Sequence, residues 1–173
     1  EMKRILAHNE RAQGHWFEAA CPRCGNTCTI VSTLRNKANT PLMNKVKCSC
    51  STIAFDYELG EAEAQALMHK EREAKPGPHP ESRLIRNSRI NAGEKMSTDH
   101  VFTPRTLICH SQLLLDIEAI ENETTRNLAR FAFTSNLANC SRLVPPIKSR
   151  GPMALGAWMT GFYVGETYLE NNV

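Results

Sequence analysis

The sequence predicts an α+β protein in which a small antiparallel β unit is followed by an antiparallel helical hairpin. Three observations support this fold class. Short stretches of β-forming residues alternate with cysteines in the first part of the chain. A proline-rich stretch then interrupts regular structure near residue 75. Two helical patterns with a short connection come next, and such a connection makes two helices antiparallel neighbours.

The β unit is expected within residues 1–74. Residues 1–14 are polar and charged and suggest the end of a helix. The strand candidates share a high content of β-branched and aromatic residues. They cover residues 15–20, 27–34, 45–50 and 52–59. Residues 36–44 are expected to form a loop, and residues 61–73, with many charges and small apolar residues, predict a helix.

Residues 75–101 are interpreted as a linker, because Pro and Gly dominate its start and bulky apolar residues are few. The helical part is expected within residues 102–173. Thr103 is a good N-cap and Pro104 suits the first helical position, so a helix is predicted from there to about residue 120. A second helix is predicted over residues 124–143, a short strand over 162–164 and the opening of a helix over 166–171.

Four cysteines in a polar, turn-rich stretch are the sharpest local signal. Cys21-Pro-Arg-Cys24-Gly places two thiols three residues apart, and Gly25 permits the left-handed conformation that closes a tight turn between them. Cys48 and Cys50 stand at the far end of the predicted hairpin, so pairing of its strands brings them back to the first pair. This arrangement is typical of a zinc ribbon, with Cys21, Cys24, Cys48 and Cys50 as ligands of a structural zinc ion.

The second half of this motif departs from the usual pattern. The spacing is Cys48-Ser-Cys50, and side chains two apart in a strand point to opposite faces. Both can bind one ion only if the chain bends at Ser49. The gap between the pairs, residues 25–47, is also longer than usual. Cys28 or His15 therefore remain alternative ligands, and core packing or free thiols remain the alternative to a metal site.

The composition permits nucleic-acid binding without demanding it. The net charge of the 173 residues is only +3, so the basic residues must be judged by where they cluster. Lys45 and Lys47 flank the hairpin loop, and Arg86 and Arg89 lie in the extended linker, where they cannot belong to a solvated helix face. We expect these residues, together with Arg105, to face nucleic acid; a solvated surface is the alternative.

Several classes of function find no support in the sequence. No Gly-rich loop follows a strand and no nucleophile motif occurs, so no catalytic residues are predicted. No apolar run is long enough for a membrane span, and no signal peptide is visible. An odd number of cysteines, seven, argues against a disulfide framework and favours a cytoplasmic location. The chain starts at Glu1 and ends at Val173, and we expect it to be a segment of a longer protein.

Three motifs, in this order, resemble those of adenine-specific DNA methyltransferases that contain a zinc ribbon. After the cysteine-rich region come Val101-Phe-Thr-Pro-Arg-Thr-Leu107, then Phe131-Ala-Phe-Thr-Ser, and finally Tyr168-Leu-Glu-Asn-Asn-Val173. The resemblance covers most of residues 17–173, and the order of the motifs is more specific than any one of them.

The resemblance implies that the chain is an insertion or fragment of a Rossmann-like methyltransferase, between its cofactor-binding and Asp-Pro-Pro-Tyr motifs. The parent would transfer a methyl group from S-adenosylmethionine to adenine in DNA, after flipping the base out of the duplex. The chain's partners would be DNA and the rest of the parent. Cys21, Cys24, Cys48 and Cys50 carry over as zinc ligands, and Arg105 carries over as a functional residue that contacts either DNA or the catalytic core of the parent. The alternative is a free-standing zinc-ribbon module that binds nucleic acid or a protein.

Overall fold

The protein is an α+β fold with one five-stranded antiparallel sheet and three α-helices within residues 14–173. The computed structural model describes residues 3, 7–8 and 14–173. The strands are β1 (Glu18–Ala20), β2 (Thr27–Asn36), β3 (Pro41–Lys47), β4 (Phe55–Glu58) and β5 (Thr167–Asn171). The helices are α2 (Glu61–Glu73), α3 (Pro104–Glu118) and α4 (Glu123–Asn136), and short 3-10 turns occupy Gly14–Phe17, Thr98–Val101 and Lys148–Arg150.

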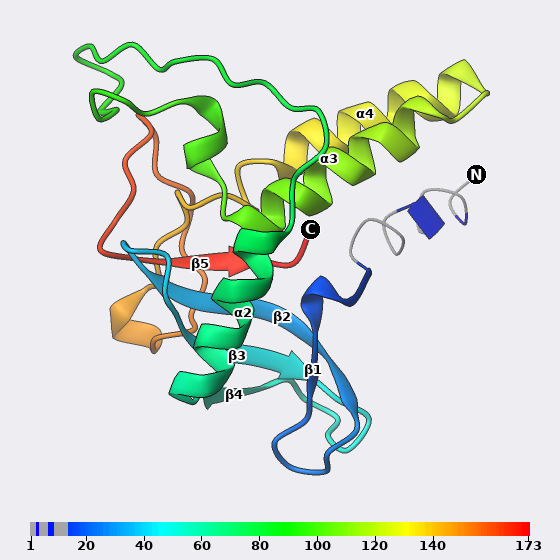
Figure 1. The fold of residues 1–173 in the computed structure, drawn as a ribbon, viewed down its shortest axis with the longest axis vertical. Helices are drawn as coiled ribbons and strands as arrows, with labels where there is room; N and C mark the ends of the chain where they lie inside the picture. The colour runs from blue at the N-terminus through cyan, green and yellow to red at the C-terminus, as the bar shows by residue number, and fades with distance from the viewer. Residues whose placement is uncertain (1–2, 4–6, 9–13) are drawn as a thin grey trace.

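β2 is the organising strand of the sheet. Its first residues pair with β1, from Ala20 opposite Thr27 to Glu18 opposite Thr29, and its last five residues pair with β5. Both partners therefore lie along one side of β2, while β3 and then β4 continue the sheet on the other side (Figure 1). All of these pairings are antiparallel. The sheet thus combines residues from both ends of the described chain.

The C-terminal strand corrects one expectation. Residues 166–171 were predicted to open a helix, and residues 167–171 instead form β5. Tyr168, Leu169 and Glu170 are all fully buried, because β2 covers one edge of the strand and other elements cover both faces. A strand buried on both faces lacks the alternation that identifies a half-exposed strand, so its local pattern was misleading.

Burial alternates along the strand only in the first half of β2. Cys28 and Ile30 are buried, whereas Thr29 and Val31 are exposed, as expected for a sheet that packs on the core with one face and faces solvent with the other. Irregular pairing with β3 follows Ile30, and beyond it every residue from Ser32 to Arg35 is buried. The second half of β2 therefore lies inside the molecule, where its polar side chains need partners.

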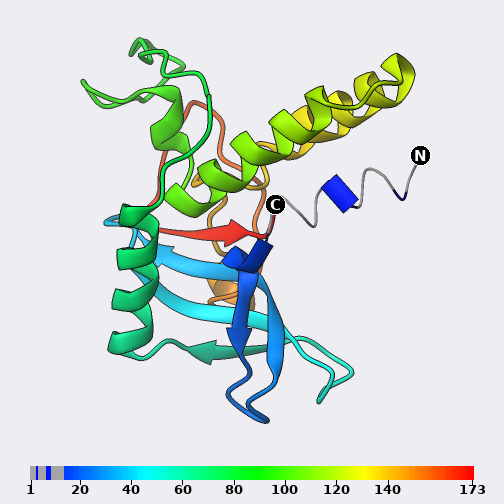
Figure 2. The same cartoon turned by 45° about the vertical axis from the view of Figure 1, so that its right-hand side comes forward.

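The three helices begin close to where the sequence predicted. α2 matches the expected range, and it packs against β3 and α3 while crossing the sheet (Figure 1). The Thr103 side chain accepts a hydrogen bond from the Thr106 backbone N–H, which confirms the N-cap of α3. Asn122 caps α4 in the same way. α4 ends at Asn136, seven residues earlier than the predicted end at residue 143, and turns follow it. Figures 1 and 2 show the α3–α4 hairpin extending away from the sheet.

The buried apolar residues form three clusters. The largest gathers Phe17, Cys28, Ile30, Val46 and Phe55 around the β unit. A second centres on Leu34, Val144, Met153 and Leu169. The third holds the hairpin together through Ile117, Ile120 and Ala129. Four of the nine buried residues in the largest cluster are cysteines, so burial of apolar area alone gives the β unit a modest stability.

Some predicted boundaries differ by a few residues. The strand predicted over 15–20 is a 3-10 turn followed by β1, the one over 45–50 is β3 and starts earlier, and the one over 52–59 is the shorter β4. Residues 162–164 form no strand. The helix end predicted for residues 1–14 lies mostly outside the described residues. The division into residues 1–74, 75–101 and 102–173 stays a prediction. Among the residues that the structure describes, no helix is long and apolar enough to cross a membrane.

Candidate metal centre

The first cysteine pair lies on a tight turn between β1 and β2. The Cys21 N–H donates to the Asn26 carbonyl at 2.8 Å, and the Gly25 N–H donates to the Cys21 carbonyl at the same distance. Gly25 has a φ of +76°, a conformation that a residue with a side chain adopts only at a cost. The turn therefore points the thiols of Cys21 and Cys24 to one side, as the Cys-Pro-Arg-Cys-Gly motif predicted.

The second pair sits where β3 ends. β3 stops at Lys47, and a hydrogen bond from the Ser51 N–H to the Cys48 carbonyl, 3.1 Å long, closes a turn through Ser49 and Cys50. Because the chain turns there and is no longer extended, Cys48 and Cys50 do not point to opposite faces. The bend that the irregular Cys-x-Cys spacing required is present.

Strand pairing brings the two turns together. Thr29 stands opposite Lys47, and so Cys48 lies beside the first turn. The Cys21 and Cys50 sulfur atoms are 3.7 Å apart and those of Cys24 and Cys48 are 3.6 Å apart, with all four within 4.8 Å of one another. A tetrahedral zinc ion with Zn–S bonds of about 2.3 Å requires sulfur atoms about 3.8 Å apart. The four thiols could therefore hold a metal ion.

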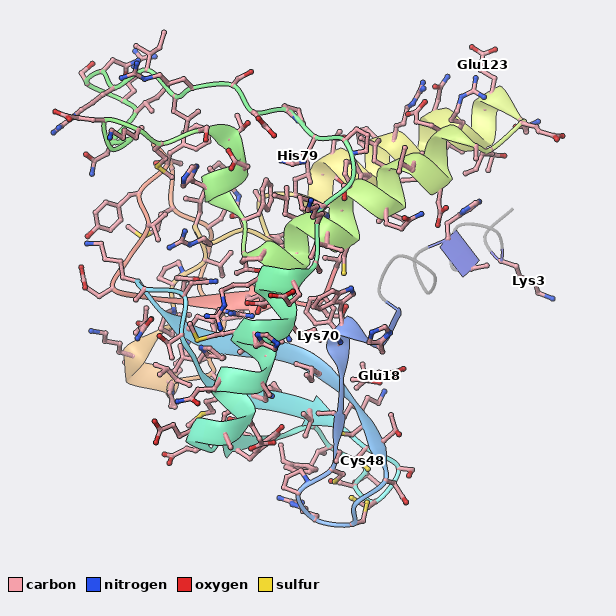
Figure 3. All side chains as sticks on the ribbon, in the orientation of Figure 1. Lys3, Glu18, Cys48, Lys70, His79 and Glu123 are labelled. Atoms are coloured by element: carbon pink, nitrogen blue, oxygen red, sulfur yellow. The ribbon has the colours of Figure 1, made fainter. Side chains whose placement is uncertain are left out.

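The site lies at the end of the β unit. In Figure 3 the Cys48 side chain and neighbouring sulfur atoms lie at the opposite end of the molecule from Glu123, at the tip of the helical hairpin. Cys21 and Cys48 are buried, whereas Cys24 and Cys50 are exposed. Half of the donor set is thus fixed by the core and the other half faces solvent, which leaves a path by which an ion enters.

The pKa values of Cys21 and Cys50 are shifted in opposite directions. Burial raises the pKa of Cys21, but the backbone N–H groups of Arg23 and Cys24 outweigh it, and the pKa falls to about 6. The contact with Cys48, followed by burial, raises the pKa of Cys50 to about 12. Thiolates placed so close together repel one another, so full ionisation of the group needs a cation among them.

Neither alternative ligand belongs to this group. Cys28 lies in the largest core cluster with Phe17 and Ile30, where burial raises the pKa of its thiol. The His15 ring stacks on Trp16, and the His15 carbonyl accepts a hydrogen bond from Lys70. Within the described part of the chain, the only group of thiol, imidazole and carboxylate ligands close enough for one ion is the four-cysteine set.

Four of the five basic residues singled out in the sequence are exposed or partly exposed, and the fifth, Arg105, is buried. Lys47, Arg86 and Arg89 are exposed, as a contact with a phosphate requires. Lys45 is partly exposed and lies 3.8 Å from Asp56. Asn87 accepts hydrogen bonds from the backbone N–H groups of Arg89 and Ile90, and these bonds hold the segment that carries both arginines in a defined turn.

Arg105 is fully buried, which corrects the expectation that it faces nucleic acid. Its guanidinium donates to Glu170 at 2.6 Å and to Thr33 at 2.6 Å, and it lies over the Phe17 ring. A guanidinium enclosed in this way cannot reach a phosphate at the surface. The Phe-Thr-Pro-Arg motif is therefore a packing motif in this chain: Thr103 and Pro104 start α3, and Arg105 connects it to the sheet.

Glu170 was not singled out from the sequence, although it is the centre of a buried ionic cluster. Its carboxylate accepts hydrogen bonds from Arg105, from Arg35 at 2.7 Å, and from the hydroxyls of Thr103 and Thr106. Arg35 also binds Glu71 of α2 at 2.5 Å. We name Arg35, Glu71, Arg105 and Glu170 the buried ionic cluster. It links β2, β5, α2 and α3.

No family model, curated protein or solved structure matches this chain. The resemblance to zinc-ribbon-containing DNA methyltransferases therefore rests on the quoted motifs alone. Among the described residues, the four thiols are the group best suited to a defined chemical role.

Proposed function

We propose that the chain is a zinc-stabilised, DNA-facing module that carries out no catalysis of its own. The observation that carries this proposal is the four-thiol cluster, in which two pairs of sulfur atoms lie 3.6 and 3.7 Å apart, as a tetrahedral zinc ion requires. Thiolates are soft ligands, and a set of four favours zinc over magnesium or calcium, which prefer oxygen. In the cytoplasm, where we place the protein, such thiols stay reduced.

A zinc ion held by four cysteines is a structural one. All four positions of the tetrahedron are filled by the protein, so no position is open for water or substrate. Its contribution is to folding: it fixes the ends of β1, β2 and β3 next to one another in a unit whose apolar core is small. This reading agrees with the absence of any nucleophile or cofactor motif from the sequence.

The DNA-facing part of the proposal is supported by exposed basic side chains. Arg86 and Arg89 sit on a turn held by Asn87, and the Asn91 N–H donates to the Gly161 carbonyl at 2.7 Å. The two guanidiniums therefore start from a constrained backbone, which lowers the entropy lost on binding a phosphate. Exposed Lys47 adds a positive charge one residue before Cys48, and Lys45 is partly exposed two residues earlier.

The motif order supports a more specific proposal about the parent protein. We propose that the chain is a segment of an adenine-specific DNA methyltransferase, where S-adenosylmethionine binds the rest of the parent. Two consequences are testable on the chain alone: calorimetric titration with S-adenosylmethionine gives no binding heat, and incubation with DNA and S-adenosylmethionine gives no methylated adenine. Methyl transfer by this chain would contradict the proposal.

The metal content tests the central claim. Protein purified without chelators is expected to contain one zinc ion per chain by elemental analysis. Cys24→Ser removes an exposed ligand, so it should lower both the zinc content and the thermal midpoint. Cys28→Val is the matched control, because it removes a nearby thiol outside the cluster and should keep the full zinc content. Zinc-free wild-type protein, or full zinc in the Cys24 variant, would refute the site.

The salt dependence of DNA binding tests the second claim. Fluorescence anisotropy with a duplex should give a linear log–log salt plot, and the double variant Arg86→Ala, Arg89→Ala should reduce its slope by about 1.8 if each arginine neutralises one phosphate. Arg126→Ala, Arg130→Ala changes the net charge equally, but these side chains bind Ile120 and Glu118 on the helical hairpin. An equal effect of both double variants would show only a general charge effect.

A further inference from the structure

A cavity of about 280 Å³ lies where the proline-rich segment passes the helical hairpin. Residues 78–80 form one wall, and Phe102, Leu107, Leu114, Phe133 and Leu137 form much of the rest. In Figure 3, His79 lies on this segment beside α3. The volume approaches the lower end of the range for small-molecule sites, which are mostly apolar with a few placed polar groups.

The wall of the cavity is held at both ends. The Gly77 N–H donates to the Ser111 hydroxyl at 2.8 Å, and the Thr98 hydroxyl donates to the Pro80 carbonyl at 2.6 Å. A side chain at position 77 would come within 3.3 Å of the Ser111 hydroxyl, so glycine allows this close approach. Between the two anchors, proline rings restrict the backbone. The cavity is thus bounded by a constrained segment and not by a freely moving loop.

His110 is the unusual residue of this cavity. It is 5% exposed, and neither of its ring nitrogens has a hydrogen-bond partner within the part of the chain that the structure describes. Its ring meets Phe102 and Phe133 edge-on, with centroid separations of 5.2 and 5.5 Å. Buried polar groups in folded proteins are almost always bonded, so an unpaired imidazole at a cavity wall calls for a partner from outside the chain.

The charge state of His110 limits which ligands can form a hydrogen bond with it. Burial lowers the pKa of its imidazole to about 4, so at neutral pH the ring is uncharged and offers one N–H donor and one nitrogen acceptor. The titratable groups at the cavity are Asp99 and His79, and both have partners: Asp99 binds Ser97 and His100, while His79 binds the Gly77 carbonyl and lies 3.7 Å from Glu81. Thr98 and Ser111 also line the cavity, and their hydroxyls donate to the carbonyls of Pro80 and Ile108, so the remaining walls are apolar and aromatic.

We propose that this cavity binds a small neutral aromatic compound that forms a hydrogen bond with His110. The rings of Phe102 and Phe133 would contact its faces or edges, in the offset or T-shaped arrangements that aromatic pairs prefer. A charged compound is disfavoured, because most of the lining is apolar and the two titratable side chains beside it, Asp99 and His79, already have partners within the chain. This site is separate from the four-thiol cluster and does not depend on zinc or on DNA binding.

Indole is the probe for this site, and its binding is measured by two-dimensional NMR titration of the zinc-loaded protein. The wild-type chain should show saturable shifts of residues around Phe102 and Phe133. Leu114→Trp fills the cavity and should abolish them, whereas Leu128→Trp, at an exposed position of α4, should not. Absence of saturable shifts at millimolar indole in the wild type, or wild-type binding by a folded Leu114→Trp variant, would overturn the proposal.

The hydrogen bond to His110 is tested with a second probe that lacks the donor. 1-Methylindole should bind the wild-type chain about tenfold more weakly than indole, the size expected when one hydrogen bond is lost. In His110→Leu the two probes should bind equally, and the variant should fold, because it removes an unsatisfied polar group. Equal binding of both probes by the wild-type chain would exclude the role given to His110.

Discussion

Glu170 shows how much a single side chain determines in this molecule. It is fully buried and accepts hydrogen bonds from two guanidiniums and two hydroxyls. Burial alone would raise the pKa of its carboxyl, but Arg105 and Arg35 outweigh burial and hold that pKa below its usual range. With Glu71 beside Arg35, the buried ionic cluster contains two positive and two negative groups and is neutral as a whole.

Glu170→Gln should lower the free energy of unfolding by about 3–5 kcal/mol, because it leaves two buried guanidiniums with one carboxylate. Urea unfolding followed by circular dichroism measures the loss. Glu166→Gln is the control. Glu166 is exposed and pairs with exposed Lys37 at 2.9 Å, and solvent screens such a surface pair, so this variant should change the stability little. Similar losses in the two variants would contradict the role of the buried carboxylate.

The same carboxylate should make stability depend on pH. Because the pKa of Glu170 is lower in the folded than in the unfolded state, its contribution is fully present above the ordinary value of 4.5 and is lost as the pH falls below it. Urea midpoints measured from pH 6 down to pH 3 should therefore fall more steeply for the wild type than for Glu170→Gln. Acid release of zinc affects both proteins and cancels in the comparison.

At the scale of the element, the helix starts were the most predictable part of the fold. Thr103-Pro104 and Asn122 act within three residues of their own position, so the local sequence contains the whole signal. The Cys-Pro-Arg-Cys-Gly turn is local in the same sense. The signal for strand β5 is not local, because its partner β2 lies about 130 residues earlier in the chain. No pattern within residues 167–171 predicts that pairing.

Asn122 is an exposed N-cap of α4, so substituting it measures how much this cap contributes to stability. Its side chain accepts a hydrogen bond from the Thr125 N–H at 2.9 Å. Asn122→Ala should therefore reduce the free energy of unfolding by about 1 kcal/mol, whereas Asn122→Asp keeps an acceptor and should change it little. Thermal unfolding of both variants measures the difference. An alanine variant as stable as the aspartate variant would show that this cap contributes nothing.

The candidate functional residues also differ in how far the sequence predicts them, because some depend on local spacing and others on contacts between residues distant in the chain. The four cysteines were found because clustered thiols are rare and their spacing is informative. Arg105 was assigned to the surface because charge alone does not reveal burial, and Glu170 was overlooked because its partners are 65 and 135 residues away. Exposed Arg86 and Arg89 agree with the expectation, and their contact with DNA stays a prediction.

At the scale of the whole molecule, β2 connects two different means of stabilisation. Its first residues adjoin the turn that carries Cys21 and Cys24, and its last residues carry Arg35 and pair with β5. One end is expected to depend on zinc and the other on the buried ionic cluster. Each end also has its own apolar contacts, since Ile30 packs in the largest cluster and Leu34 packs in the cluster with Val144 and Leu169.

Removal of zinc should therefore loosen one end of the sheet before the other. With a chelator present, amide hydrogen exchange should accelerate most at residues 18–29 and 45–50, while β5 and α3 keep more of their protection. Hydrogen exchange followed by mass spectrometry measures both regions in one experiment. Uniform loss of protection along the chain would show that zinc supports the whole fold cooperatively.

The distance between Arg35 and Glu170 along the chain also has a consequence for synthesis. At 5–20 residues per second, the ribosome adds the 135 residues between them in roughly 7 to 27 s. Cys48 and Cys50 follow Arg35 within 15 residues, so for most of that interval the cysteine turns can already take up a metal ion, while Arg35 has no carboxylate from β5 to neutralise it. In the nascent β unit the half of β2 that later pairs with β5 stays unpaired, and an unpaired strand edge favours aggregation.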